Sequence, residues 1–338
     1  MIGSIRIQIF NFGIEIFLKD EEIITKIKKD FDYFLVNSLN KSKKILTIKA
    51  SQVENYKIDQ KLIATKQTEN SIYYDHGEIR YNDYYGKALT IFNYNDESVE
   101  VKYKTNNIAH ELLYLLVLSR SGKYCDLHGY HKIHASAVSY NNKNLIYMMP
   151  SKGGKSTMLM ELLRDEDVKI ISDDTPVVNR WGRLYCFPLR IGHESDNKLF
   201  NYFPYLRDEN LYEFKRSNYS KKFLVSTSEL KNKIEVGEKA ILVVGFRSTN
   251  ENPELKKTSK LRMLKELQTH MIAGIGLPMI VEYFLQNSLI DHVRNSKILL
   301  SRILSSLFLL KKSDCYFLYT SSNTRDNSRK IMELLNEE

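Results

Sequence analysis

The stretch Asn144-Leu-Ile-Tyr-Met-Met-Pro-Ser-Lys-Gly-Gly-Lys-Ser-Thr-Met-Leu-Met-Glu-Leu-Leu163 organises the rest of the chain. Its first residues are apolar and typical of a buried strand, two adjacent glycines follow, and the last residues predict the start of a helix. A strand, a glycine-bearing loop and a helix in this order outline a phosphate-binding P-loop. Backbone N–H groups of residues 151–156 would surround a polyphosphate, and the helix N-terminus would add its positive end. The segment therefore predicts a nucleotide site.

Individual residues of this loop carry separate parts of the prediction. Lys155 should reach the β- and γ-phosphates, and the Ser156 hydroxyl should bind Mg²⁺. The consensus motif opens with a glycine where this chain has Met149, so Pro150 and Ser151 must make the first turn. A chance resemblance to the motif is the alternative. The residues expected to bind the nucleotide are Ser151, Lys152, Gly153, Gly154, Lys155, Ser156 and Thr157.

Length and composition indicate a folded globular protein. The chain has 338 residues, 43% of them hydrophobic, which is enough for two domains and a substantial core. Its net charge of +9 favours anionic partners, and its three widely separated cysteines suit free thiols in a reducing compartment. The longest apolar runs, residues 271–281 and 303–310, are too short to span a bilayer, and the alternating N-terminus does not predict a signal peptide. We therefore expect a cytoplasmic protein with no membrane partner.

The N-terminal part, residues 1–105, predicts a mostly β module with one helix. Short Ile-, Tyr- and Val-rich segments from residue 45 to residue 103 are separated by turn signals, as in an antiparallel sheet. The many tyrosines fit half-buried sheet positions better than a base-stacking surface. Before these segments, strands are expected over residues 4–10 and 14–18, and a helix over residues 21–35.

The second domain, residues 106–338, predicts a mixed α/β or α+β fold around the P-loop. It begins with a helix over residues 108–119 that is apolar on nearly all sides and should end at Gly122. Strands and helices then alternate to the C-terminus. The later strands are expected over residues 221–226, 239–246 and 315–320, and the later helices over residues 259–272, 280–310 and 328–337.

One cysteine and three histidines recur at every third residue, as Cys125, His128, His131 and His134, so a metal site has to be weighed. A strand would direct alternate members to opposite faces, Gly129 argues against a continuous helix, and no second ligand cluster follows. These observations disfavour a metal site.

His134 has another interpretation. Residues 133–140 and 145–149 predict the two strands of a hairpin with a tight turn at residues 141–143. Pairing the strands back from that turn sets His134 opposite Pro150, beside the bound phosphates. A histidine that only satisfies a hydrogen bond at a strand end is the alternative.

A second apolar strand, residues 168–172, ends in Asp173 and Asp174 and is similar to a Walker B element. The interval from Lys155 to Asp173 is long enough for only one helix, a turn and one strand, so both acids should lie near the P-loop. One carboxylate can hold Mg²⁺ while the other accepts a proton from an attacking hydroxyl. An ordinary Asp-Asp turn is the alternative.

Arg190 follows the acids in the chain. Residues 183–187 and 188–192 predict a further hairpin, which carries Arg190 on its second strand. Its guanidinium could stabilise the charge on a transferred phosphoryl group or form a surface ion pair. The sequence does not separate these two roles.

Together, His134-Ala-Ser-Ala-Val138, the Ser151–Ser156 loop and Ser172-Asp-Asp174 resemble the corresponding motifs of HPr kinase/phosphorylase and the HPr-kinase-related kinases, over about residues 134–192. These proteins share their fold with phosphoenolpyruvate carboxykinase. The resemblance implies a nucleotide-dependent serine kinase with His134, Asp173, Lys155 and Arg190 at the reacting phosphoryl group. It also implies that Asp174 and Ser156 hold Mg²⁺. The chain departs from the family at Met149 and at Pro188-Leu-Arg190, which lacks the family's acidic residue before the arginine.

Functional expectations follow from these motifs. The resemblance implies ATP or GTP and Mg²⁺ as cofactors, and a serine-bearing peptide or small protein as acceptor. The N-terminal module resembles the stand-alone related kinases associated with lasso and other ribosomal peptides more than the HPr kinase partner domain, which implies a ribosomal precursor peptide as one acceptor. A regulatory or structural module that binds a nucleotide and transfers nothing is the alternative. The set of Asp173, Asp174 and His134 favours the kinase, because a passive binder needs no general base. A nucleic-acid-dependent NTPase lacks a dense aromatic and basic motif, so no nucleic acid partner is expected, and homo-oligomer formation stays open.

Overall fold

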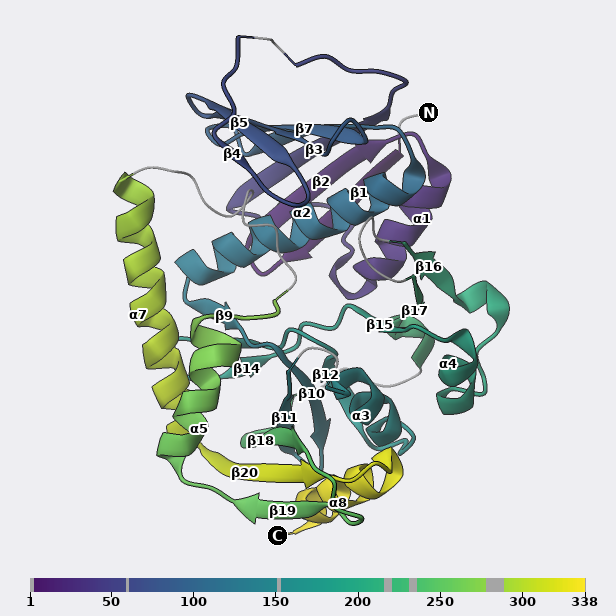
Figure 1. The fold of residues 1–338 in the computed structure, drawn as a ribbon, viewed down its shortest axis with the longest axis vertical. Coiled ribbons are helices and arrows are strands. Elements are labelled where there is room, and N and C mark those ends of the chain that lie inside the picture. The colour runs from purple at the N-terminus through teal and green to yellow at the C-terminus, as the bar shows by residue number, and fades with distance from the viewer. Residues whose placement is uncertain are drawn as a thin grey trace. The chain divides into compact units, whose positions relative to one another are not determined.

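The computed structural model describes two compact units within residues 3–58, 61–150, 153–215, 221–230, 236–277 and 289–337 (Figure 1). The first unit contains Met1–Tyr124 and Tyr212–Leu224, and the second contains Cys125–Leu211, Val225–Leu277 and the chain from Ser288 onward. By this division the first unit extends beyond residue 105, because most of the helix that follows is grouped with it. The mixed α+β class expected from the sequence is confirmed.

The first unit is built on an eight-stranded sheet in the order β1-β2-β3-β8-β7-β6-β5-β4. Strands β2 and β3 are parallel, as are β3 and β8, while the other neighbours are antiparallel. The predicted first hairpin is confirmed, with Ile5 opposite Ile16 and both side chains buried. The strands are β1 Gly3–Ile9, β2 Phe12–Leu18, β3 Lys44–Gln52, β4 Lys66–Gln67, β5 Ile72–His76, β6 Ile79–Asp83, β7 Ala88–Asn93 and β8 Ser98–Tyr103.

Two helices belong to this sheet's unit. The first, α1 (Glu21–Asp30), begins where the Asp20 carboxylate accepts a hydrogen bond from the Ile23 N–H, and a 3₁₀ turn η1 (Asp32–Phe34) follows it. The second, α2 (Asn106–Leu127), does not stop at Gly122 as expected. A glycine inside a helix costs only about 1 kcal/mol, and the buried residues around Gly122 outweigh that cost. The left-handed backbone conformation falls instead at Gly129, where φ is 75°.

A short antiparallel pair also lies in the first unit. Strand β16 (Tyr212–Phe214) pairs with β17 (Lys222–Ser226), and Tyr212 is opposite Leu224. The Tyr212 hydroxyl donates to Asp30 at 2.6 Å, and His110 contacts the other oxygen of that buried carboxylate at 2.7 Å. These bonds explain why a late segment of the chain belongs to the N-terminal unit.

The second unit is built on a six-stranded sheet in the order β12-β10-β11-β18-β20-β19. Strands β11, β18 and β20 are parallel neighbours, whereas β10 is antiparallel to both of its neighbours, and β19 is antiparallel to β20. The strands are β10 Ala135–Tyr140, β11 Lys143–Met148, β12 Lys169–Ser172, β18 Lys239–Arg247, β19 Glu254–Lys257 and β20 Ser313–Thr320.

The hairpin expected before the glycine-bearing loop is confirmed. Its turn consists of Asn141 and Asn142, which have φ values of 46° and 60°, the left-handed pair that a two-residue hairpin turn requires. Because the turn takes two residues rather than three, Ala135 pairs with Met148, and the register continues to His134 opposite Met149. The expected partner of His134 was Pro150, so the predicted register was one residue out.

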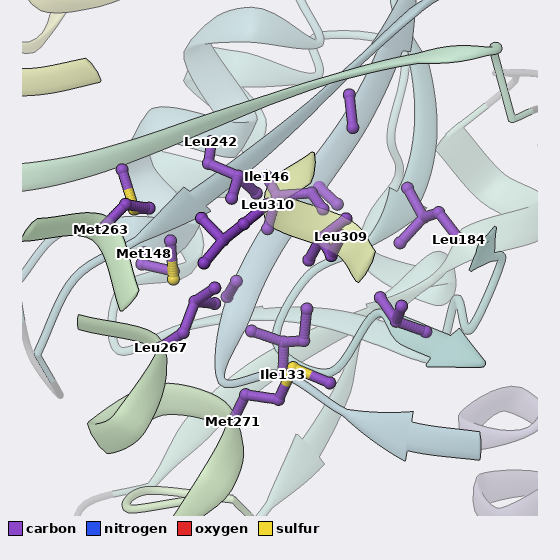
Figure 2. Packing of buried hydrophobic residues seen from close by; sticks show 14 of the residues in the cluster. Ile133, Ile146, Met148, Leu184, Leu242, Met263, Leu267, Met271, Leu309 and Leu310 are labelled. Atoms are coloured by element: carbon purple, nitrogen blue, oxygen red, sulfur yellow. The ribbon is translucent and has the colours of Figure 1, made fainter. Parts of the chain in front are cut away.

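Helices pack on both faces of this sheet (Figure 1). One face carries a buried cluster in which Ile133, Ile146 and Met148 meet residues of α5, η4 and α7, as Figure 2 shows. Each such side chain contributes about 1.5–3 kcal/mol when it is fully buried. On the other side, α3 packs against β10 and α8. The helical segments are α3 Lys155–Leu162, α4 Asp196–Tyr202, η2 Asp208–Asn210, η3 Thr227–Leu230, α5 Lys260–Leu267, the π-helical η4 Gln268–Ile272, α7 Leu289–Lys311 and α8 Thr324–Asn336.

The hairpin predicted from residues 183–192 is wrong. Strand β14 (Leu184–Tyr185) pairs with β13 (Val177–Asn179), which in turn pairs with β9 (Tyr130–Lys132), while β15 (Arg190–His193) belongs to another three-stranded sheet, in the order β15-β17-β16. The turn lies earlier in the chain, because the Asn179 side chain accepts from the N–H groups of Trp181 and Arg183.

None of the helices in the described ranges has the length and apolar character needed to cross a membrane.

Candidate functional site

Three separate chain segments meet at one edge of the six-stranded sheet because of its strand directions. Strand β10 runs antiparallel between β11 and β12, so those two strands point the same way. Their carboxyl ends therefore lie at the same edge as the beginning of β10. This edge brings together the glycine-bearing loop after Met148, the acids after Ser172 and His134 before Ala135.

The loop after β11 turns at Pro150, whose carbonyl accepts from the Gly153 N–H at 2.9 Å. Gly154 caps α3 with φ 107°, a conformation that favours glycine. Met149, which stands at the position of the missing consensus glycine, is buried and lies against Gly153. A Cβ on Gly153 would come within 2.7 Å of the Met149 side chain. The absence of a side chain at Gly153 therefore leaves room for the Met149 side chain.

Lys155 begins α3 and is almost fully buried, at 7% exposure. Its Nζ donates to the Met149 carbonyl at 2.9 Å, which draws the ammonium group back across the loop. A buried ammonium is costly unless it has strong partners. Ser151 and Lys152, also expected to bind the nucleotide, lie outside the described residues.

The two aspartates pair differently from the expectation. Ser156 donates from its hydroxyl to Asp173 at 3.3 Å, whereas His134 Nε2 is 3.3 Å from Asp174 Oδ1. The family resemblance implies instead that Asp174 lies with Ser156 around Mg²⁺ and that Asp173 acts with His134, whereas the sequence pattern alone left the roles of the two acids open. The Asp174 side chain is 40% exposed, so it is the more accessible of the two groups in the His134 pair.

The turn that presents these acids is held by its own hydrogen bonds. Ser172, the last residue of β12, donates to the Phe187 carbonyl at 2.9 Å and accepts from the Thr175 N–H at 3.0 Å. The Asp174 carbonyl accepts from the Ala135 N–H at 3.2 Å, which ties the turn to the start of β10. The carboxylates are therefore carried on a backbone fixed at both ends.

The environment of His134 contains a residue that sequence reasoning missed. The His134 N–H donates to the backbone carbonyl of His270 at 2.8 Å, and the two imidazole rings are 5.8 Å apart. His270 belongs to η4, far from every motif in the sequence, and no spacing rule connects it to the P-loop. The only signal was a single histidine in an otherwise amphipathic helical stretch.

Electrostatics at His270 reflect the same neighbourhood. Burial, followed by the charges of His134 and Lys155, lowers the pKa of His270 to about 4. The imidazole is therefore neutral near pH 7. Gly276, with φ 90°, packs against the His134 ring so tightly that a Cβ at this position would lie 2.3 Å from His134 Cε1.

Two further residues expected in the site, Arg190 and Thr157, lie close to the start or the face of α3. Arg190 begins β15, which contacts α3, and its side chain is only 8% exposed. Phe187, three positions earlier, donates its N–H to the Ile171 carbonyl at 3.0 Å, so the segment leading to Arg190 lies beside the end of β12. Thr157 lies in the first turn of α3 and is half-buried.

Within the described residues, no three His, Cys, Asp or Glu side chains gather around a common point where they could hold a metal ion. His131 is instead bonded at both ring nitrogens, with Nδ1 2.8 Å from Asp126 and Nε2 2.8 Å from Ser301. Burial raises the pKa of Cys125 to about 12, which leaves its thiol protonated. His131 and Cys125 are therefore parts of the core.

The Asp126 carboxylate also binds Arg302 of α7 through two hydrogen bonds, at 3.0 and 2.6 Å. The same guanidinium donates to the carbonyls of Met271 and Ile272, at the end of η4. Burial alone would raise the pKa of Asp126, but the hydrogen bond from His131 and the charge of Arg302 hold it below its ordinary value. This network fixes the segment that carries His270.

The arrangement combines a buried lysine at a loop before a helix, a serine beside one carboxylate, and a histidine beside another. Oxygen ligands of the Ser156 and Asp173 kind suit Mg²⁺, which is held through one or two carboxylates together with phosphate oxygens. A carboxylate paired with a histidine can accept a proton. The chain matches no protein-family model and no curated protein sequence.

Proposed function

We propose that this protein is a nucleotide- and Mg²⁺-dependent kinase that transfers the terminal phosphoryl group to a serine hydroxyl of a peptide or small protein. The observation that carries the proposal is the meeting of Lys155, the Ser156–Asp173 pair and the His134–Asp174 pair at one sheet edge. These are separate groups for binding phosphates, holding a cation and accepting a proton. A passive nucleotide-binding module would need only the first two.

The phosphate side of the proposed site consists of the loop and the start of α3. Lys155 would exchange its bond to the Met149 carbonyl for phosphate oxygens, and the N–H groups at the helix start would face the same charge. Ser156 and Asp173 would hold Mg²⁺, because their oxygens already lie 3.3 Å apart. The cation would neutralise charge that develops on the β- and γ-phosphate oxygens.

The acceptor side of the proposed site consists of Asp174 and His134. Asp174 would accept the proton of the serine hydroxyl while that oxygen bonds to the γ-phosphorus. The bond from the γ-phosphorus to the oxygen bridging to the β-phosphate breaks, and the nucleoside diphosphate leaves. His134 would orient the Asp174 carboxylate, since its Nε2 lies 3.3 Å from Oδ1. The 40% exposure of Asp174 leaves the carboxylate accessible to a hydroxyl from outside the chain.

This assignment exchanges the roles that the family resemblance implies for the two acids. The resemblance still supports the HPr-kinase-like class and a serine acceptor, including a ribosomal precursor peptide. ATP and GTP both satisfy the phosphate chemistry.

The test compares Asp173→Asn with Asp174→Asn. Both variants and the wild type are incubated with ATP or GTP, Mg²⁺ and candidate serine peptides, and the intact mass of the peptides reports transfer of a phosphoryl group. Asp174→Asn should keep Mg²⁺-dependent nucleotide binding by calorimetry and lose roughly 10² or more in transfer rate, the usual scale for a general base. Asp173→Asn should weaken the Mg²⁺-dependent part of binding. The reverse pattern would restore the roles implied by the family resemblance, and a wild type that binds nucleotide but modifies no peptide would favour the non-catalytic module.

A further inference from the structure

Helix α7 is apolar on two opposite sides. One side carries Leu309 and Leu310 into the buried cluster of the second unit, where α7 packs beside α5 (Figure 1). The other side leaves Leu300, Leu304 and Leu307 exposed, by 59%, 45% and 45%. Single exposed leucines are common on protein surfaces, but several on one helical face form a continuous apolar surface that indicates a binding site.

The exposed leucines belong to a regular row along the outer side of α7. Leu300 and Leu307 follow Val293 at intervals of seven residues, and Leu304 stands seven residues from a lysine on either side. Six side chains, all of them exposed, make up this α7 row, which consists of Val293, Lys297, Leu300, Leu304, Leu307 and Lys311. Their spacing alternates between four and three residues, which is the spacing of the seam between two helices packed side by side. The row therefore fits another helix.

The single tryptophan of the chain extends this surface. Trp181 is 59% exposed and lies in the turn after β13, with its ring 5.6 Å from the ring of Phe308 on α7. Phe308 follows Leu304 of the row by one helical turn. The turn is attached to the helix, because the Ser305 hydroxyl donates to the Asn179 carbonyl at 2.7 Å. An exposed tryptophan beside exposed leucines is typical of the anchors that dominate binding interfaces.

The charge around this surface is positive. Arg180 and Arg183 flank Trp181 in the turn and are exposed, and the α7 row itself contains two lysines. Asp291, the single acid in the sequence of α7, is buried. A second copy of this chain would bring the same positive charges to the interface, and like charges oppose association. A helix with acidic residues beside an apolar stripe would complement both the charge and the leucines.

We propose that the α7 row and Trp181 form a docking surface for an acidic amphipathic helix of a protein or peptide partner. The leucines of the row would pack between those of the partner helix, whose flanking acids would pair with Lys297 and Lys311. Nucleic acid would use the positive charges but not the leucines, and a lipid surface favours a wider apolar face than one row that contains lysines. Binding here requires no phosphoryl transfer, so it can be tested without a nucleotide.

The fluorescence of Trp181 reports on this surface directly, because the chain has no other tryptophan. The full-length protein is titrated with a synthetic peptide of about three heptads that carries Leu at positions a and d, Glu at positions e and g, and no aromatic residue. The emission should shift to shorter wavelength as the indole is buried, and high salt should weaken the binding. A scrambled peptide of the same composition should leave the emission unchanged. Absence of a shift with the heptad peptide would overturn the proposal.

Two variants locate the contact. Leu304→Glu should weaken the affinity for the heptad peptide at least tenfold, as expected when one buried anchor is lost. Ile63→Glu makes the same kind of change at an exposed apolar residue of the first unit, and its affinity should equal that of the wild type. Because both positions are exposed, both variants should keep the melting temperature of the wild type. Equal affinities of the two variants would show that the peptide does not bind at the α7 row.

Other occupants are tested with the same protein. Analytical ultracentrifugation of the wild type and Leu304→Glu shows whether the surface binds a second copy, and a wild-type dimer that Leu304→Glu dissociates would overturn the acidic partner. Phosphatidylglycerol vesicles and a single-stranded oligonucleotide are also titrated while the Trp181 emission is recorded. A shift with either of them, but not with the heptad peptide, would assign the surface to lipid or to nucleic acid instead.

Discussion

Replacement of Arg302 by leucine should destabilise the second unit strongly, because it leaves a buried carboxylate without its cation. Asp126 is 4% exposed, and after the change His131 is its remaining side-chain hydrogen-bond partner among the described residues. Breaking a buried ion pair from one side costs about 3–5 kcal/mol. In a unit of this size each kcal/mol lowers the melting temperature by about 2–4 °C, so the expected loss is about 10 °C.

The chain supplies a matched control on the same helix. Arg294 is exposed, so Arg294→Leu removes the same charge from α7 without opening the network. Surface substitutions of this kind change stability by about 0.5 kcal/mol or less, which corresponds to about 2 °C at most. Thermal unfolding of both variants at pH 7, followed by circular dichroism and calorimetry, compares the two losses.

A double variant tests the cause. Asp126→Asn in the Arg302→Leu background removes the uncompensated charge, so the double variant should melt higher than Arg302→Leu alone. Equal losses of melting temperature for Arg302→Leu and Arg294→Leu would refute the assignment of the loss to a buried charge. A double variant that melts lower than Arg302→Leu would refute it as well.

Three further predictions concern the proposed site. Lys155→Ala should weaken ATP and GTP binding at least tenfold in calorimetric titrations and abolish transfer, and unchanged affinity in a folded variant would contradict the P-loop assignment. Gly276→Ala should cost roughly 1–3 kcal/mol because it combines a φ of 90° with a Cβ 2.3 Å from His134, whereas Gly77→Ala, where φ is 59° and the space is open, should cost less in the same denaturant titration. Because the pKa of His270 is about 4 when folded and near 6.5 when unfolded, the unfolded state binds more protons between these values, so stability should fall as pH drops from 6.5 to 4. His270→Asn should show a shallower fall over that window, and parallel pH profiles for the two proteins would contradict the shifted pKa.

Helices and strands that depend mainly on their own residues were predictable from local patterns in the sequence. The β10–β11 hairpin was predictable because two asparagines tolerate the left-handed turn and a short run of buried residues lies on each side of it. Its register was one residue out because the sequence does not distinguish a two-residue from a three-residue turn here. The helix end expected at Gly122 was wrong, because burial of the residues around Gly122 outweighs the local tendency of glycine to end a helix.

Contacts between distant segments were not predictable in the same way. The pairing of Ser156 with Asp173 rather than Asp174 depends on a turn held by Ser172, Thr175 and Phe187. The side chains of two adjacent acids in a turn point in different directions, which depend on the backbone conformation of the turn. The order of the acids in the sequence therefore does not say which one faces which partner. His270 and Arg302 reach the site through tertiary packing of η4 and α7, for which the sequence contains no spacing rule.

The strand that precedes the P-loop has a further consequence during synthesis. Every sequence motif of the proposed site has been synthesised once residue 192 has been added, yet β11 needs β18, residues 239–247, on its open side. Until then the nascent chain presents an apolar strand edge, buried over all of Asn144–Met148 in the finished protein. Such edges pair readily with other chains. A fragment that contains the whole motif region but stops before β18 therefore has the chemistry of the site without the sheet that protects it.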